Sequence, residues 1–244
     1  MSLVETDWLK KNIGSVKIID CSWHMPQTKR SGIEEYKNQH IPNSIFFDLD
    51  ANSKKEIDLP HMLVNQSDWE QIVSKMGVKN EDEIVIYDNS DVISSCRCWF
   101  NFIYFGHNPK LVHVLNGGLK KWIKENNEVT KNITNIQQSN YKSFEKKELV
   151  KNKKSINQNI NEQKFKVIDA RSKERFEGKV QEPRKGLRSG SIKNSFCIPF
   201  DQCLNENKTF KSKEDLKLIF ETCLENINEK NIVFSCGSGV TACV

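Results

Sequence analysis

The chain has 244 residues, with 37 Lys and Arg against 32 Asp and Glu, giving a formal net charge of +5. The two signs are interleaved, so the concentrated basic face of a nucleic-acid-binding protein is not expected. A hydrophobic share of 37% supports folded cores, and no apolar run approaches the length of a membrane span. We therefore expect a cytoplasmic protein of one large or two modest domains, and the sequence leaves a mitochondrial form open.

The first half alternates short apolar strands with helical stretches, which is typical of a parallel sheet covered on both faces. The predicted strands occupy residues 16–22, 44–48, 83–88 and 111–115. A helix is expected over 67–76, because Ser67 is a favourable N-cap and Glu70 stands at the capping-box position. A second, aromatic helix is expected over 99–105.

Residues 125–160 form a polar stretch that we interpret as an interdomain linker. Its composition is rich in Asn, Lys, Gln and Ser. We expect it to wrap back across the first half, with a strand near 141–144 and a helix after Glu148. Its lysines are typical of a solvated surface rather than of a binding patch.

The second half repeats the first, which indicates two tandem copies of one α/β unit. Asp20 and Asp88 end two strands of the first copy and are 68 positions apart, while Asp169 and Cys236 of the second copy are 67 apart. The repeat predicts a first domain over 1–124 and a second over 161–244. Within the second, Ser212 is expected to cap a helix that runs to Leu224.

The candidate nucleophile is Cys236, which ends the last apolar strand. Gly237 and Gly239 follow it and allow a tight loop whose main-chain N–H groups turn inward around the sulfur. A helix beginning after Thr241 would add positive partial charge there. Such surroundings favour the nucleophilic thiolate form. The alternative is a buried structural cysteine beside a glycine-rich turn.

The second copy ends at Val244, eight residues past Cys236, whereas the first continues through a helix and a strand beyond Asp88. We therefore expect the second domain to be incomplete. The eight cysteines contain no Cys-x-x-Cys pair, and we expect free thiols, no metal site and no cofactor.

Nine motifs occur in an order that covers nearly the whole chain. They are Asp20 with Ser22 and Trp23, Glu35-Tyr36, His40-Ile41-Pro42, 46–50, 61–63, 116–119 with Trp122, Asp169-Ala170-Arg171, Glu182-Pro183-Arg184, and 236–242. In this set the chain resembles the two-domain rhodanese family. The resemblance implies two tandem rhodanese-like domains, the first catalytically silent and the second carrying the nucleophile Cys236. Asp88, at the equivalent position of the first copy, cannot carry a transferable sulfur.

The loop after Cys236 indicates which sulfur donor to expect. Members of the family that use thiosulfate have basic residues there, whereas Gly237 and Ser238 are uncharged. The chain is similar to members that use 3-mercaptopyruvate, and the likeness implies that Arg175 and Arg184 hold its carboxylate. An arginine fork can grip a carboxylate with two hydrogen bonds. The alternative for each arginine is a surface salt bridge.

The resemblance also implies a catalytic set that spans both domains. Ser238 is expected to form a proton relay with Cys236 and Asp50, with Asp48 as the competing carboxylate. His61 is expected to support this site, and its alternative is a packing role. The rest of the donor site is expected to be lined by Gly237, Gly239, Val240 and Thr241.

The expected reaction is attack of the Cys236 thiolate on the sulfur of 3-mercaptopyruvate, which yields an enzyme persulfide and pyruvate. The sulfur would pass to a thiol such as reduced thioredoxin, to a small dithiol or to cyanide. The alternatives are a thiosulfate sulfurtransferase and an inactive rhodanese-like binding module. A Cys-(x)5-Arg phosphatase is disfavoured because Ala242 occupies the sixth position. One departure from the family is the segment 191–194, whose turn is expected to differ.

Overall fold

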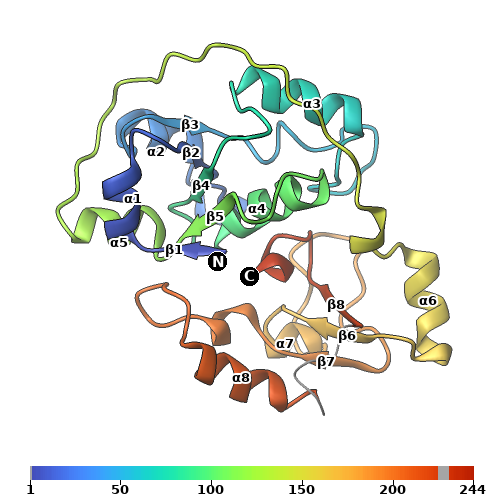
Figure 1. Ribbon diagram of the computed structural model, residues 1–244. Helices are drawn as coiled ribbons and strands as arrows, with labels where there is room; N and C mark the ends of the chain where they lie inside the picture. Colours follow the sequence, from blue (N-terminus) through green and yellow to red (C-terminus); the bar gives the residue numbers. More distant parts are fainter. Residues whose placement is uncertain (1, 225–230) are drawn as a thin grey trace. The chain divides into compact units, whose positions relative to one another are not determined.

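The computed structural model describes residues 2–224 and 231–244. The chain divides into two compact units, Met1–Lys147 and Glu148–Val244 (Figure 1). The expected linker, 125–160, is split by this boundary, so that its first part packs with unit 1. Each unit is described by itself.

Unit 1 is a parallel five-stranded sheet with helices on both faces, in the strand order β1-β5-β4-β2-β3. Its strands are β1 (Leu3–Val4), β2 (Lys17–Asp20), β3 (Ser44–Phe46), β4 (Ile84–Tyr87) and β5 (Val112–Leu115). Its α-helices are α1 (Thr6–Asn12), α2 (Gly32–Asn38), α3 (Gln66–Lys75), α4 (Ser94–Tyr104) and α5 (Gly118–Lys124). Short 3-10 turns lie at η1 (Pro26–Thr28) and η2 (Lys147–Leu149), the latter at the unit boundary.

Helices cover both faces of this sheet, as the apolar strands predict. On one face, Leu9 of α1 and Trp122 of α5 pack in one cluster with Val85 of β4. On the other face lie α3 and α4 (Figure 1). The rings of Trp69 of α3 and Phe102 of α4 are in contact, with centroids 5.2 Å apart. All four residues of β4 are consequently buried.

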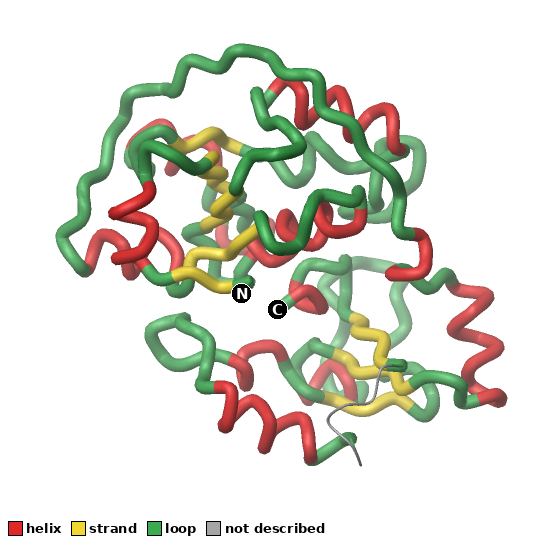
Figure 2. Tube along the Cα trace, viewed as in Figure 1, coloured by secondary structure: helices red, strands yellow, loops and turns green. Residues whose placement is uncertain are grey.

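Two local predictions for unit 1 are wrong, and both involve Glu70. Helix α3 begins one residue earlier than expected, and its N-cap is Asn65, whose side chain accepts from the N–H of Asp68 at 2.9 Å. Glu70 accepts instead from the N–H of Ser143 at 2.8 Å. The stretch 141–144 therefore forms no strand, because side chains of α3 and its flanks satisfy its backbone. Figure 2 shows 125–147 as a long loop passing over the outside of unit 1.

Unit 2 repeats the centre of this architecture with three parallel strands in the order β7-β6-β8. Its elements are α6 (Lys153–Glu162), β6 (Lys166–Asp169), α7 (Lys173–Phe176), β7 (Ser195–Cys197), η3 (Phe200–Cys203), α8 (Lys213–Glu221), β8 (Ile232–Ser235) and η4 (Thr241–Cys243). Ser212 caps α8 by accepting from the N–H of Asp215 at 3.1 Å, which confirms the predicted cap, but the helix ends at Glu221 and not at Leu224. Ile168 of β6 packs beneath Leu216 and Phe220 of α8.

The strand registers place the two copies in correspondence. Asp20 of β2 pairs with Tyr87 of β4, and Asp169 of β6 pairs with Ser235 of β8. The next residues along the chain, Asp88 and Cys236, are therefore equivalent, as the repeat predicts.

The turn before the second strand is also shared by the two copies. Asn43 and Asn194 both adopt a left-handed conformation, with φ of 65° and 64°. In each copy the following serine donates its N–H to a carbonyl three residues earlier, at 3.1 Å: Ser44 to Ile41 and Ser195 to Ile192. Asparagine tolerates positive φ through its short polar side chain, so the altered sequence at 191–194 keeps the turn.

The strands β4 and β8 differ in their neighbours. In unit 1, β5 pairs with β4 on the side away from β2. In the part of unit 2 that the structure describes, β8 is an edge strand, and Phe234 is 45% exposed. The loop that contains Cys236 thus follows a strand that is less covered than its counterpart in unit 1.

A buried carboxyl in unit 1 gives a testable prediction about stability. Asp20 is fully buried, and burial raises its pKa from 3.8 to about 6. Above pH 6 the Asp20 carboxyl is ionised in both the folded and the unfolded chain, but water solvates it better in the unfolded chain. Its burial then lowers the free energy of unfolding by about 3 kcal/mol. Below pH 4 the carboxyl is protonated, and this destabilisation disappears. Asp20→Asn should therefore stabilise unit 1 by about 1–3 kcal/mol at pH 8 and by much less at pH 4.

All five tryptophans lie within unit 1, so tryptophan fluorescence during urea unfolding reports this unit specifically. Asp7→Asn is a suitable control, because Asp7 is exposed in the first turn of α1. A gain in stability of Asp20→Asn that is equal at pH 8 and pH 4 would contradict the assigned cause.

Candidate active site

The loop that follows β8 presents Cys236 at the carboxyl end of the parallel sheet. Its half-buried sulfur accepts a hydrogen bond from the N–H of Gly239 at 3.1 Å. Gly239 has a φ of 75°, which side-chain-bearing residues rarely adopt. Val240 is buried behind the loop, and a 3-10 turn begins at Thr241. A main-chain N–H aimed at sulfur stabilises negative charge there.

Gly237 serves a different purpose from the one that the sequence suggested. It does not adopt the left-handed conformation. A Cβ at this position would instead lie 3.1 Å from Nη2 of Arg175, which is the only heavy atom of the described residues within 4 Å outside its chain neighbours. Gly237 therefore makes room for a guanidinium beside the cysteine.

Both predicted donor-binding arginines meet at this residue. Arg175, on α7, approaches the Cα side of Gly237, and Arg184 donates from Nη2 to the Gly237 carbonyl at 2.5 Å. Two guanidinium groups thus lie beside the residue that follows the nucleophile. This arrangement can bind an anionic group next to the sulfur.

A network of ion pairs holds Arg175 in place. Glu182 accepts from Arg175 Nη2 at 2.5 Å and from Arg175 Nε at 3.2 Å, and its Oε1 also accepts from Arg171 at 2.8 Å. Arg171 in turn binds Asp169, the last residue of β6, at 2.6 Å. The hydrogen bond from Arg175 lowers the pKa of Glu182, and the bond to Asp169 raises the pKa of Arg171. The sequence predicted a role for Arg175 at the donor site, but it presented Glu182 and Arg171 only as parts of motifs and indicated no role for them.

In unit 1, Asp50 and His61 form a second cluster. Asp50 accepts from Nε1 of Trp23 at 2.8 Å and lies 3.0 Å from Nε2 of His61. The His61 side chain is buried, whereas that of Asp50 is 65% exposed. The hydrogen bond with His61 is the main cause that lowers the pKa of Asp50. An ionised, accessible carboxylate supported by a buried imidazole results.

The structure also distinguishes Asp50 from Asp48. Strand β3 ends at Phe46, so the alternation of side chains along a strand does not apply to either residue. Asp48 accepts from the N–H of Ala51 at 2.8 Å and so closes a local turn. Asp50 and His61 belong to unit 1, while Cys236 and the half-buried Ser238 belong to unit 2.

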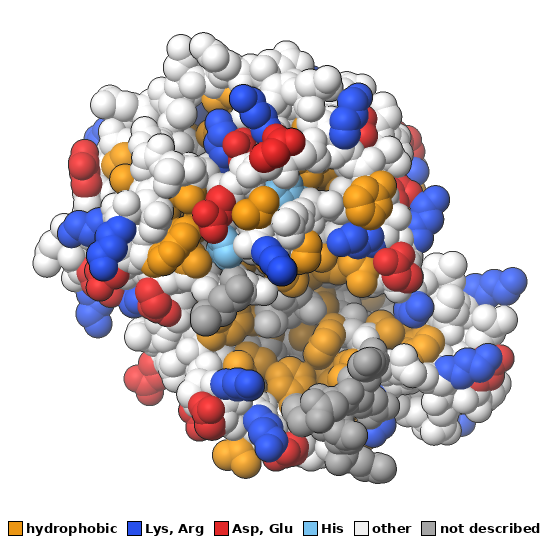
Figure 3. Space-filling model, in the orientation of Figure 1, with side chains coloured by type: hydrophobic (Ala, Val, Ile, Leu, Met, Phe, Trp, Pro, Cys, Tyr) orange, Lys and Arg blue, Asp and Glu red, His pale blue; other side chains and the backbone are white. Residues whose placement is uncertain are grey.

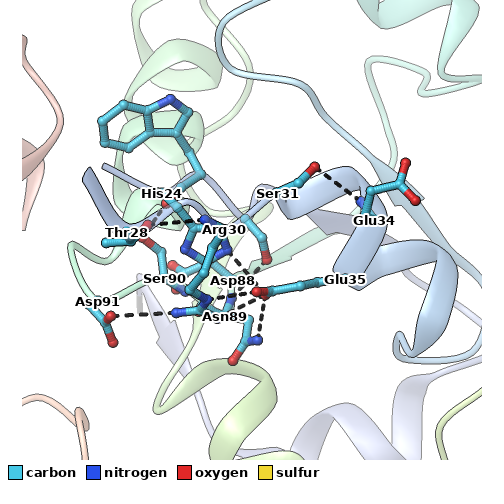
Figure 4. Close-up of polar contacts among 12 residues, drawn as sticks. His24, Thr28, Arg30, Ser31, Glu34, Glu35, Asp88, Asn89, Ser90 and Asp91 are labelled. Carbon is cyan, nitrogen blue, oxygen red and sulfur yellow. Dashed lines mark hydrogen bonds and ion pairs between the residues drawn. The ribbon is translucent and has the colours of Figure 1, made fainter. Parts of the chain in front are cut away.

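The unit 1 counterpart of the cysteine loop is filled by its own carboxylate. Asp88 is buried and accepts from the N–H groups of Ser90 and Ser95, each at 2.8 Å. Burial raises the pKa of Asp88. In Figure 4, Glu35 of α2 lies beside this loop and binds Arg30 at 2.7 Å. The amides that could surround a sulfur are therefore already occupied.

On the face drawn in Figure 3, basic and acidic side chains are interspersed. None of the helices in the described residues combines the length and apolar content needed to cross a membrane. Within the same residues, no three His, Cys, Asp or Glu side chains are placed to hold a metal ion. None of the eight cysteines, all of which lie in the described residues, forms a disulfide bond.

The fold and the cysteine loop together define a class of protein: tandem α/β units, one of which presents a cysteine at the end of its parallel sheet. Comparison with known families agrees with this class. The chain belongs to the rhodanese family, since the family model of the rhodanese-like domain matches residues 5–125 and 152–244. This match confirms the expected fold class of tandem rhodanese-like segments, each with a parallel sheet flanked by helices.

Individual relatives indicate which members of the rhodanese family the chain resembles. The chain is 39% identical over 266 residues to thiosulfate/3-mercaptopyruvate sulfurtransferase 1, mitochondrial, of Arabidopsis thaliana, covering 99% of this chain and 69% of the relative. It is 32% identical to mouse 3-mercaptopyruvate sulfurtransferase, covering 99% of this chain and 83% of the relative. Among solved structures, the Escherichia coli 3-mercaptopyruvate sulfotransferase SseA aligns with a TM-score of 0.88 at 29% identity, covering 100% of this chain and 91% of SseA.

Proposed function

We propose that the protein is a sulfurtransferase that takes sulfur from 3-mercaptopyruvate through a persulfide on Cys236. The observation that carries this proposal is the convergence of Arg175 and Arg184 on Gly237, next to a sulfur that accepts a main-chain N–H. A carboxylate-bearing thiol could bind the guanidinium groups while its sulfur meets Cys236. The relatives named above act on the same class of donor.

The chemistry follows from these groups. The Cys236 thiolate attacks the donor sulfur, and the carbon–sulfur bond breaks with its electron pair remaining on carbon. The resulting enolate takes up a proton and leaves as pyruvate. The N–H of Gly239 stabilises the charge on sulfur throughout. A thiol acceptor then attacks the outer sulfur of the persulfide and regenerates the thiolate.

The direct test measures pyruvate release and the sulfur added to Cys236 in the same experiment. Protein treated with 3-mercaptopyruvate and no acceptor should release about one pyruvate per chain and gain one sulfur atom on the peptide that contains Cys236. Thiosulfate is the comparison donor, and we expect a lower kcat/KM for it. Absence of both pyruvate and added sulfur would favour the rhodanese-like binding module instead. A higher kcat/KM for thiosulfate would favour the thiosulfate sulfurtransferase.

The proton relay is part of the proposal. We assign Ser238 and Asp50 to it, with His61 keeping Asp50 ionised. Asp50→Asn and Ser238→Ala should each lower kcat by about 10²-fold, and the double variant should lose little more than either single one. Asp48→Asn is the matched control and should stay within about twofold of the parent, because Asp48 only closes a local turn. Full additivity of the two losses would argue against a shared relay.

The proposed domain roles, sulfur acceptor and compartment rest on the chemistry of these residues and on similarity to the relatives named above. The first domain, expected over 1–124, acts as the silent partner because Asp88 replaces the nucleophile, and 125–160 joins it to the catalytic domain over 161–244. A dithiol protein such as reduced thioredoxin is the proposed acceptor, since it can attack the outer sulfur and release it as sulfide. We place the protein in the cytoplasm or, as for the Arabidopsis relative, in mitochondria.

A further inference from the structure

We infer that Glu182 is the positioning residue that holds both donor-binding arginines at the Cys236 loop. This inference rests on the proposed function, because it concerns how the same site recognises the donor carboxylate. Glu182 acts through Arg175 and Arg184 and does not itself touch the donor.

The first support is how Glu182 binds Arg175. Its side chain is only 4% exposed, and both of its oxygens accept hydrogen bonds from the guanidinium, at 2.5 and 3.2 Å. Two parallel bonds fix the plane of a guanidinium, which a single bond cannot do. That plane is what brings Nη2 of Arg175 against Gly237.

The second support is the place of Glu182 in the chain. In unit 1, His40 follows Tyr36 of α2 by only four positions. In unit 2, the segment 177–190 lies between α7 and the turn at 191–194, so this connection is much longer. Glu182 ties this segment to the sheet through Arg171, which binds Asp169 at the end of β6 and donates to the Gly190 carbonyl at 2.8 Å.

Arg184 depends on the same anchor. It follows Glu182 by two residues, with Pro183 between them, and the proline ring restricts the backbone on both sides. Fixing Glu182 therefore limits where Arg184 can lie, and Arg184 reaches the Gly237 carbonyl. In this group of five side chains, the negative charges of Asp169 and Glu182 offset the positive charges of Arg171 and Arg175. The net positive charge of the group is therefore that of Arg184.

The test is Glu182→Gln with Glu177→Gln as the matched control. A glutamine turns an NH2 group toward the guanidinium donors and loses the two-point grip. Glu177 lies in the same segment, but its ion pairs with Lys179 and Lys173 are on the surface. We expect Glu182→Gln to raise KM for 3-mercaptopyruvate about tenfold, with kcat and the constants for thiosulfate changed by less than about threefold. Added to Arg175→Ala, it should raise KM by less than it does alone.

A second measurement needs no sulfur transfer. Iodoacetate and iodoacetamide alkylate the same thiol, but only iodoacetate carries a carboxylate, so the ratio of their rates at Cys236 reports carboxylate recognition. If Glu182→Gln only removed a negative charge, the anionic iodoacetate would react faster relative to iodoacetamide, and the ratio would rise. If the substitution displaces the arginines, carboxylate recognition is lost and the ratio falls. We expect Glu182→Gln to lower the ratio and Glu177→Gln to leave it unchanged.

The two measurements separate two failures. If the parent protein releases no pyruvate but Glu182→Gln still lowers the alkylation ratio below that of the parent, the proposed function is wrong and the role of Glu182 stands. If pyruvate is released but Glu182→Gln changes neither KM nor the ratio, or raises the ratio, the role of Glu182 is wrong. Circular dichroism of each variant establishes that the fold is retained.

Discussion

Cys236→Ser should abolish pyruvate release from 3-mercaptopyruvate, with a loss of at least about 10³-fold in kcat. A serine hydroxyl at the same place is not ionised near neutral pH and cannot form a persulfide. The N–H of Gly239 would then stabilise no charge on sulfur. Coupled detection of pyruvate measures the loss, and mass spectrometry should find no added sulfur on the corresponding peptide.

The matched control is Cys223→Ser, which removes a half-buried thiol of the same unit. Cys223 lies outside the loop, 13 residues before Cys236, and its sulfur is 3.5 Å from the hydroxyl of Thr222. We expect its activity to remain within about twofold of the parent. Comparable losses in the two variants would mean that unfolding of unit 2, and not loss of a nucleophile, explains the result.

The second large effect is expected at Arg184. Because a charge-assisted hydrogen bond is worth about 1.5–3 kcal/mol, Arg184→Ala should raise KM for 3-mercaptopyruvate roughly 10- to 100-fold. Thiosulfate has no carboxylate, so its KM should change by less than about threefold. Arg184→Lys keeps the charge without the planar fork and should fall between the two.

Steady-state kinetics with both donors measures this difference. Arg188→Ala is the control, since Arg188 is exposed and lies in the same segment. Equal losses on both donors in Arg184→Ala would show that the residue supports the loop and not the carboxylate. An unchanged KM for 3-mercaptopyruvate would remove Arg184 from the donor site.

The repeat made most of the fold predictable, because its strands are strongly apolar and recur at nearly equal spacing. Aligning Asp88 with Cys236 required only those spacings, and the strand registers confirm it. Caps were less predictable: Ser212 was found, but Asn65 was missed because Ser67 offered an equally good side chain two residues later. Local sequence cannot decide which of two suitable residues actually caps the start of the helix.

The site was less predictable than the fold, for a physical reason. The glycines after Cys236 suggested a loop of inward-turned amides, yet Gly237 is required for the space beside Arg175. Glu182 lies seven positions from Arg175 and eleven from Arg171, and only the folded segment brings the three together. Contacts of this kind depend on the path of a long loop, which no periodic pattern records.

The carboxylate that fills the unit 1 loop has a consequence for stoichiometry. Because the Asp88 side chain is covalently attached, the N–H groups of Ser90 and Ser95 that it accepts from cannot be vacated for a substrate, an inhibitor or a sulfane sulfur. Each polypeptide can then carry at most one labile sulfur by this chemistry, although it contains the same loop position twice. Under the proposed function, the two copies of the loop therefore differ in that one can hold a transferable sulfur and the other is filled by its own side chain.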